Sequence, residues 1–368
     1  ANSAGTVNLT GTATMSTAGA TLGGANTIAI ATLTVTSPGT VTNSGTVSIA
    51  TALNGTGTFT NGDGSTGTLI ITPATIAVTT FAASANGNTV NYAGGAQTVR
   101  AVTTYHDLIF SGSAAKTLSA TTTTINGDLT LTGTASTTTA VSLNIGGNLA
   151  IGDGTTFTAA GFDLTVNGTT TVGGGTSGSL VISSATGTKI FVGAITTAAG
   201  STWNNSGNSA VTYRGGITHN GSTFTTGSGI QTFNTSATQS LNSSAAMSFP
   251  SITITSPTVL TNNLSSGLTI GTALAGNGGL TQGTGDSLIL GGTATGITLT
   301  ASASGNTVTY NSTTAGQTML AGPYYHLTIN KSGQIATLGG STTVDGNLTV
   351  SAGTLAGSAN LTVAGNAT

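Results

Sequence analysis

The chain has 368 residues, of which five are Lys or Arg and seven are Asp, and its formal net charge is −2. Such a balance offers no basic surface for nucleic acid and no electrostatic attraction to an anionic membrane. The absence of cysteine excludes a disulfide scaffold and thiolate metal sites. No apolar run reaches the roughly 18–20 residues of a membrane-spanning helix, so we expect no membrane insertion.

The residue types predict an all-β protein. Only 3% of the residues are charged, against roughly 25% in an ordinary globular domain. Disordered chains are normally charged and poor in β-branched residues, whereas this sequence is rich in Val, Ile and Thr, which favour strands.

A short strand of the form apolar-x-apolar recurs along the whole chain. The steps between neighbours are nearly constant, with one shorter step from Ile252 to Leu268. This period predicts about 18 coils of roughly 20 residues each. The strands are Val7-x-Leu9, Ile28-x-Ile30, Val47-x-Ile49, Leu69-x-Ile71, Val90-x-Tyr92, Leu108-x-Phe110, Leu129-x-Leu131, Leu149-x-Ile151, Thr170-x-Val172, Ile190-x-Val192, Val211-x-Tyr213, Gln231-x-Phe233, Ile252-x-Ile254, Leu268-x-Ile270, Leu288-x-Leu290, Val308-x-Tyr310, Leu327-x-Ile329 and Leu348-x-Val350.

Glycines repeat in the same phase as these strands. Gly127, Gly147 and Gly168 follow one another at intervals of one coil, which suits corners with positive φ or a closely packed backbone. Asp128 and Asn148 follow the first two glycines, and their spacing permits a polar ladder. Further glycines at the same point of the phrase are Gly346 and Gly365.

The spacing predicts a single-stack parallel β-solenoid, or β-helix, over one continuous domain, residues 1–368. A lone coil cannot bury its apolar side chains, but stacked coils bury a continuous core. At about 4.8 Å per coil, 18 coils would span about 85 Å. Two segments are related by a nearly constant offset along the chain, 87–131 and 305–350.

The period, the G-[DN]-L-x-[VIL] phrase and the Thr/Gly/Asn bias resemble bacterial β-strand-repeat surface proteins, among them filamentous-haemagglutinin-like adhesins. The resemblance implies a right-handed β-helix, secretion, an extracellular or cell-surface location, and an adhesive or structural role. It carries over no functional residues.

The acids are too scattered for a polysaccharide-cleaving site, which needs clustered carboxylates or a calcium site. Asp107 and Asp128 are one coil apart, with His106 beside them, and we expect a polar ladder there.

Asn61 to Gly64 (N-G-D-G) is typical of a turn. The histidines have no metal-spaced partners and are expected on surface turns. We therefore predict no catalytic residue, no metal and no cofactor. The acids are Asp63, Asp107, Asp128, Asp153, Asp163, Asp286 and Asp345, and the histidines are His106, His219 and His326.

Aromatic residues concentrate in the two related segments. Core or corner packing is the simpler interpretation, and an exposed polymer interface or glycan contact is the alternative. The residues proposed for that contact are Tyr105, Tyr324, Tyr325 and Trp203.

Two Thr-x-Thr runs, at 32–36 and 56–60, raise an ice-binding interpretation. Their first residues, Thr32 and Thr56, are further apart than one coil. The runs are therefore out of phase with the neighbouring coils, which argues against ice binding.

The favoured function is a non-enzymatic structural subunit of an extracellular filament. Its copies would join head to tail through uncapped solenoid ends, because open strand edges attract other strands. The alternative is the shaft of a large cell-surface adhesin, with surface glycans as partners. An ice-binding solenoid and a polysaccharide-active β-helix are minor alternatives. No nucleic-acid partner is expected.

Overall fold

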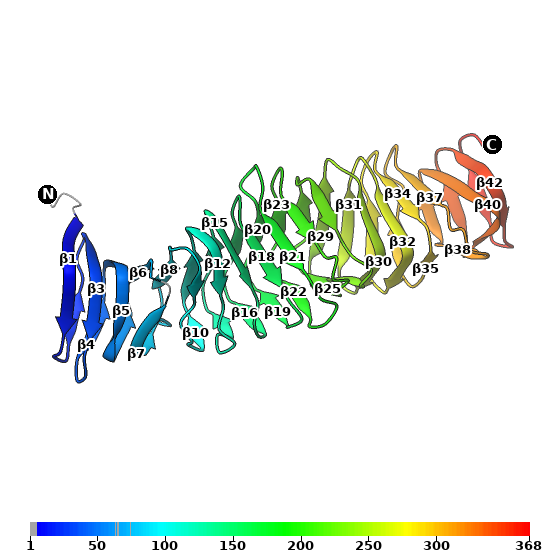
Figure 1. Cartoon of the computed structure of the whole chain (residues 1–368). Helices are drawn as coiled ribbons and strands as arrows, with labels where there is room; N and C mark the ends of the chain where they lie inside the picture. Colours follow the sequence, from blue (N-terminus) through cyan, green and yellow to red (C-terminus); the bar gives the residue numbers. More distant parts are fainter. Residues whose placement is uncertain (1–5, 63, 65, 74) are drawn as a thin grey trace. The chain divides into compact units, whose positions relative to one another are not determined.

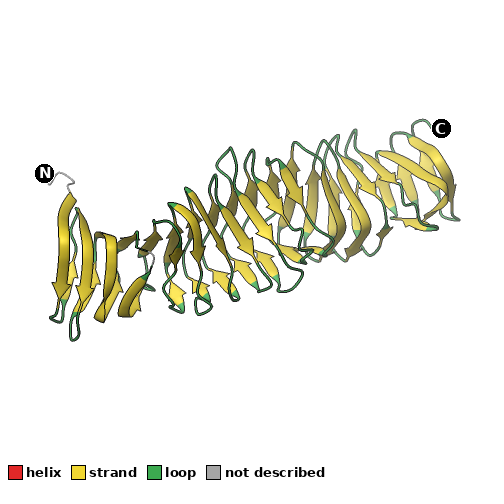
Figure 2. Ribbon diagram, in the orientation of Figure 1, coloured by secondary structure: helices red, strands yellow, loops and turns green. Residues whose placement is uncertain are grey.

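The computed structural model describes residues 6–368 with the exception of 63, 65 and 74. Within these residues every regular element is a β-strand, and the strands of successive coils lie side by side and run parallel (Figures 1 and 2). The chain is therefore all-β and forms a parallel β-solenoid, as predicted. It has about 17 turns, close to the 18 counted from the sequence.

The chain divides into two compact units. Unit 1 comprises residues 1–181 and 199–202, and unit 2 comprises residues 182–198 and 203–368. Each unit is a stack of coils. A single continuous domain over 1–368 stays a prediction, as does the right-handed winding. Two strands contain residues of both units, β21 (Ser179–Ile182) and β24 (Thr202–Asn204).

Unit 1 contains one uninterrupted column of parallel strands in which the predicted apolar-x-apolar pairs lie above one another. Its members are joined through Val7, Ile28, Val47, Leu69, Val90, Leu108, Leu129, Leu149 and Thr170. The strands of unit 1 are β1 (Thr6–Met15), β2 (Ala20–Leu22), β3 (Thr27–Val35), β4 (Thr40–Asn43), β5 (Thr46–Asn61), β6 (Thr68–Ile71), β7 (Ile76–Ala82), β8 (Thr89–Tyr92), β9 (Gln97–Thr98), β10 (Thr104–Tyr105), β11 (Asp107–Phe110), β12 (Ser113–Thr117), β13 (Thr124–Ile125), β14 (Leu129–Leu131), β15 (Thr134–Thr138), β16 (Leu143–Ile145), β17 (Leu149–Ile151), β18 (Thr156–Ala159), β19 (Leu164–Val166) and β20 (Thr170–Val172).

The core of each unit comes from the alternation of side chains along its strands, since successive residues of a strand point to opposite faces. In β6, Leu69 and Ile71 are fully buried, whereas Thr68 and Ile70 are only half-buried. Each buried aliphatic side chain contributes about 1.5–3 kcal/mol relative to exposure. Stacking the coils therefore stabilises a fold in which no single coil has a core of its own.

Unit 2 repeats this arrangement in columns of its own. Val211, Gln231 and Ile252 pair in succession, as do Leu268, Leu288, Val308, Leu327 and Leu348. Its strands are β22 (Lys189–Phe191), β23 (Ile195–Thr197), β25 (Val211–Tyr213), β26 (Ile217–His219), β27 (Thr223–Thr225), β28 (Gln231–Asn234), β29 (Thr238–Ser243), β30 (Met247–Thr255), β31 (Val259–Asn263), β32 (Leu268–Gly276), β33 (Gly279–Gln282), β34 (Ser287–Leu290), β35 (Thr293–Ala294), β36 (Thr298–Thr300), β37 (Thr307–Tyr310), β38 (Gln317–Met319), β39 (Gly322–Tyr324), β40 (His326–Leu338), β41 (Thr342–Val344), β42 (Leu348–Ala356) and β43 (Leu361–Val363).

The short step predicted from Ile252 to Leu268 is wrong. Ile252 pairs with Leu274, and Leu268 pairs with Met247. Both pairings involve β30, whose register shifts between Phe249 and Ser251, so its two halves belong to different columns. The short step therefore joined two separate columns.

The predicted strand Ile190-x-Val192 is shifted by one residue. Lys189 and Phe191 are buried, and Phe191 pairs with Tyr213, whereas Ile190 and Val192 are half-buried. A one-residue shift moves every side chain to the opposite face of a strand.

The relationship between the two units extends beyond the predicted segments 87–131 and 305–350. Each unit contains a Ser-Pro dipeptide at the corresponding place, Ser37-Pro38 and Ser256-Pro257. Buried amide side chains also recur, since Asn43 donates to Asn61 as Asn262 donates to Gln282. The recurrence thus includes residues before 87 and before 305.

Candidate functional site

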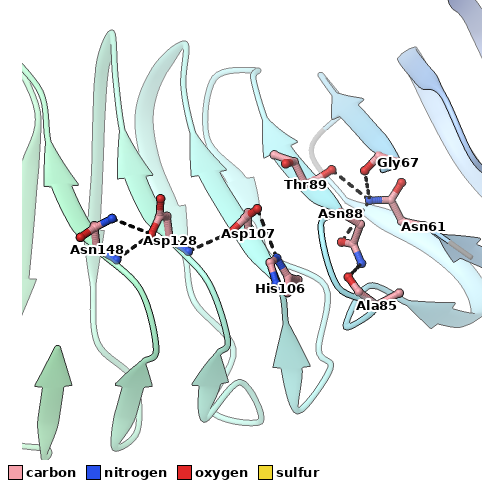
Figure 3. A network of polar contacts seen from close by, with 9 residues as sticks. All are labelled: Asn61, Gly67, Ala85, Asn88, Thr89, His106, Asp107, Asp128 and Asn148. Atoms are coloured by element: carbon pink, nitrogen blue, oxygen red, sulfur yellow. Dashed lines mark hydrogen bonds and ion pairs between the residues drawn. The ribbon is translucent and has the colours of Figure 1, made fainter. Parts of the chain in front are cut away.

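A polar ladder runs along one corner of unit 1, at the phrase where the sequence predicts it (Figure 3). Asp107 Oδ1 accepts the backbone N–H of Asp128 at 2.8 Å, and Asp128 Oδ1 accepts that of Asn148 at 2.6 Å. Asn148 Oδ1 in turn accepts the backbone N–H of Thr169 at 2.8 Å. Each side chain thus satisfies a donor one coil further along, and the predicted ladder is confirmed.

The glycine column makes room for this ladder. A Cβ atom on Gly127 would lie 2.0 Å from Asp107 Oδ1, and a Cβ atom on Gly147 would lie 2.2 Å from Asp128 Oδ1. Neither glycine has a positive φ. Of the two reasons that the sequence offers for glycine here, close approach is therefore the one that applies.

A second ladder occupies the related corner of unit 2. His326 Nδ1 accepts the backbone N–H of Asn347 at 3.0 Å, and Asn347 Oδ1 accepts that of Asn366 at 3.1 Å. A Cβ atom on Gly346 would lie 2.7 Å from His326 Nδ1, the same crowding as at Gly127. Histidine thus takes the place of an aspartate.

The ladder geometry favours a structural role over acid–base chemistry. One carboxylate oxygen of Asp107 and one of Asp128 already accept backbone hydrogen bonds. The other Asp107 oxygen, Oδ2, lies 3.2 Å from His106 Nδ1, an ion pair when the imidazole is protonated. In the described part of the chain, no group of three His or Asp side chains could hold a metal ion.

Buried asparagines form a second, internal network in unit 1 (Figure 3). Asn61 Nδ2 donates to the carbonyls of Gly67 at 3.1 Å and Thr89 at 2.9 Å. Asn88 lies beside it and donates to the carbonyl of Ala85. Because both asparagines are fully buried, these bonds offset the cost of removing an amide from water. Asp63, in the predicted N-G-D-G turn, lies outside the described residues.

Tyr105 is not on the surface. It is 0% exposed, and its hydroxyl lies 3.1 Å from that of Tyr92. Tyr105 Oη donates to the carbonyl of Arg100, and Tyr92 Oη accepts the Arg100 backbone N–H. Burial raises the pKa of Tyr92 to about 12. Core packing is therefore confirmed for Tyr105, and the proposed exposed contact is wrong.

Tyr324 repeats this arrangement in unit 2. It is buried, its hydroxyl lies 2.9 Å from that of Tyr310, and it donates to the carbonyl of Leu320. The exposed contact proposed for Tyr324 is wrong for the same reason. Tyr325 points elsewhere: it is half-buried, and its ring packs edge-on against His326 with the centroids 4.6 Å apart. A contact role for Tyr325 stays a prediction.

Trp203 is also fully buried, so the exposed contact proposed for it is wrong. Its ring stacks on Phe224 with the centroids 5.3 Å apart and meets Phe191 edge-on at 5.1 Å. His219 belongs to the same aromatic cluster and is buried, which corrects its expected place on a surface turn. Its Nδ1 lies 2.6 Å from Thr197 Oγ1, and burial lowers its pKa.

Sequence reasoning missed the buried lysines. Lys116 is 1% exposed, and its Nζ donates to the carbonyls of Gly94 and Gly95 at 2.6 Å and to Gln97 Oε1 at 2.8 Å. Lys331 is buried in the same way, with Nζ 2.7 Å from the carbonyl of Ser312. The two related segments share a Gln-Thr phrase, at residues 97–99 and 317–319, but the spacing along the sequence did not assign a cation to the loops beside it.

Asp153 has a structural role in a loop of unit 1. Its Oδ1 accepts the backbone N–H groups of Gly174, Thr176 and Ser177. These bonds hold the pKa of the Asp153 carboxyl at about 2. The carboxylate is therefore a fixed acceptor.

The two Thr-x-Thr runs lie in different columns, as their spacing predicts. Thr32 and Thr34 pair with Thr12 and Thr14. Thr58 and Thr60 pair instead with Thr40 and Thr42.

The coil of residues 6–22 leaves apolar side chains uncovered. Val7 and Leu9 are 51% and 43% exposed, although they belong to the same column as the buried Ile30. None of the described residues forms a helix that is long and apolar enough to cross a membrane.

Comparison of the chain with protein-family models, curated proteins and solved structures finds no match in any of the three. The resemblance to bacterial surface proteins therefore stays a prediction.

Proposed function

We propose that the chain is a non-enzymatic structural subunit of an extracellular filament, built from copies joined head to tail. The observation that carries this proposal is the exposure of Val7 and Leu9. Their column continues into Val47 and Ile49, which are fully buried. Among the described residues no strand pairs with the other edge of β1, and a strand of a second copy would bury these two side chains there.

The coil of residues 354–368 offers a matching surface. Leu355 is half-buried, whereas its neighbour Ala336 in the preceding coil is fully buried. Val363 is half-buried and pairs on one side with the buried Val344. Open strand edges with apolar side chains are templates for pairing with another chain. The extracellular location rests on the resemblance to bacterial surface proteins.

Electron microscopy of the purified protein in negative stain tests the proposal. We expect fibres many times longer than one chain for the unmodified protein, and short particles for the double variant Val7→Lys, Leu9→Lys. Ile230→Lys is the matched control, because Ile230 is 52% exposed but lies outside the coils of residues 6–22 and 354–368. Unmodified protein that stays as single particles at all concentrations would reject the filament.

The adhesin shaft remains the second candidate, and the recurrence of buried features supports it. The contact between the hydroxyls of Tyr92 and Tyr105 recurs between Tyr310 and Tyr324. The buried ammonium of Lys116, which donates to loop carbonyls, recurs as that of Lys331. Long tandem repeats are typical of extended solenoid arrays. A shaft would give isolated particles and no fibres, and a glycan array would then test adhesion.

A further inference from the structure

This inference rests on the proposed filament and concerns the surfaces that join its copies. We propose that a second copy continues the winding of the first, so that three pairs of strand segments form together. Segment 6–9 would pair with 354–356, 12–15 with 361–363, and 20–22 with 366–368.

Each of these segments is covered on one side only among the described residues. In the coil of residues 6–22, the two halves of β1 pair with β3, and β2 pairs with β4. In the coil of residues 354–368, the end of β42 pairs with β40, β43 pairs with β41, and Ala367 bridges to Leu348. Three consecutive segments are thus open on each surface.

The order of the pairs follows from the winding. A parallel coil rises by one strand spacing, about 4.8 Å, in each turn. On each open surface the three segments therefore lie at successive heights along the solenoid axis, and the segment that comes first in the chain has the smallest height. Two such steps interlock only when the earliest segments, 6–9 and 354–356, meet. The second and third segments then meet in chain order, and all three pairings are parallel.

The side chains of the middle pair match. Ala13 and Met15 point inward, because they pair with the buried Leu33 and Val35. Leu361 and Val363 have the same alternate spacing along their strand, and Val363 pairs with the buried Val344.

The outer pairs are apolar as well. Val7 and Leu9 would meet Leu355, and Ala20 and Leu22 would meet Ala367. Segments 6–27 and 346–368 contain no charged residue, so no like charges oppose each other across the junction.

The junction joins two different surfaces, so it repeats without closing and produces a linear polymer. It follows that a copy blocked on one surface can still bind through the other. This property separates the proposed junction from a symmetric contact between two equal surfaces.

A mixing experiment tests the pairing. One variant carries Ala13→Lys and Met15→Lys, and the other carries Leu361→Lys and Val363→Lys. Their matched controls, Thr14→Lys and Thr362→Lys, place the charge on the exposed side of the same segments. Circular dichroism and thermal unfolding of each variant check that it is folded, and light scattering gives the mass of each species.

We expect each double variant alone to stay monomeric at concentrations at least tenfold above those at which the unmodified protein and both controls polymerise. An equimolar mixture should form a dimer of twice the 35.2 kDa chain mass, because each partner retains one open surface. Polymerisation of either folded double variant alone, or a dimer of one variant with itself, overturns the pairing while the filament stands. Unmodified protein that never polymerises rejects the filament and the pairing together.

Discussion

Asp107 in unit 1 and His326 in unit 2 hold the same place in two related corners. Asp107 Oδ1 accepts the backbone N–H of Asp128 at 2.8 Å, and His326 Nδ1 accepts that of Asn347 at 3.0 Å. The next residue of each strand, Leu108 or Leu327, is fully buried. The corner therefore requires a hydrogen-bond acceptor rather than a carboxylate, which supports a structural role for the ladder.

Removing the acceptor at Asp107 should destabilise unit 1. For Asp107→Ala we expect the free energy of unfolding to fall by about 1 kcal/mol, the usual net value of one hydrogen bond. Asp107→Asn keeps a side-chain oxygen and should stay within about 0.5 kcal/mol of the unmodified protein. Urea denaturation followed by circular dichroism measures both, and equal losses for Ala and Asn would show that the carboxylate charge matters instead.

The glycine beside this acceptor should not tolerate a side chain. Gly127→Ala would place a Cβ atom 2.0 Å from Asp107 Oδ1, and crowding of this kind typically costs about 1–3 kcal/mol. Gly271→Ala is the control, because no atom lies within 4 Å of the Cβ position there. Thermal unfolding should show a lower midpoint for Gly127→Ala alone, and equal midpoints would contradict the explanation of the glycine column.

The buried ammonium of Lys116 should be essential to its loop. Lys116→Met keeps most of the apolar stem but leaves the Gly94 and Gly95 carbonyls and Gln97 Oε1 without this donor. We expect a loss of about 3 kcal/mol in the free energy of unfolding. Arg214→Met removes an exposed cation and should change it by less than about 0.5 kcal/mol. Similar urea midpoints for the two variants would rule out this role.

Stability should decrease in alkaline solution. Burial raises the pKa of Tyr92 and Tyr310 from 10.0 to about 12. The folded chain thus keeps these protons when the unfolded chain loses them. The stability that each contributes is full below pH 10 and is lost as the pH rises towards 12. Two pKa units correspond to about 2.7 kcal/mol for each tyrosine.

Lys116 and Lys331 change the stability in the opposite direction as the pH rises. Burial lowers the pKa of each ammonium, so the folded chain loses these protons before the unfolded chain does. Tyr105, Tyr213 and Tyr324 have raised pKa values as well, so the tyrosines should dominate. The urea midpoint of the unmodified protein should be lower at pH 11 than at pH 9. In the double variant Tyr92→Phe, Tyr310→Phe, the difference between the two midpoints should be smaller. A midpoint that does not change with pH would refute the assignment.

The sequence by itself determined the stacking of coils. Parallel neighbours require similar apolar strands at a constant separation, so the pairing of Val90 with Leu108, and of Leu108 with Leu129, follows from the period alone. The ladder from Asp128 to Asn148 was predictable for the same reason, since residues one period apart lie above one another.

Only the tertiary structure decided which side chains of the loops and secondary strands point inward. Each coil has several strand segments joined by loops of variable length, and a shift of one residue exchanges core and surface. The period therefore could not place Trp203, Tyr105 or Lys116. Trp203 fills a cluster of aromatic rings that only the packing of several coils brings together. Lys116 is buried because the loop at 94–97 turns its carbonyls towards one point, and a cation satisfies them there.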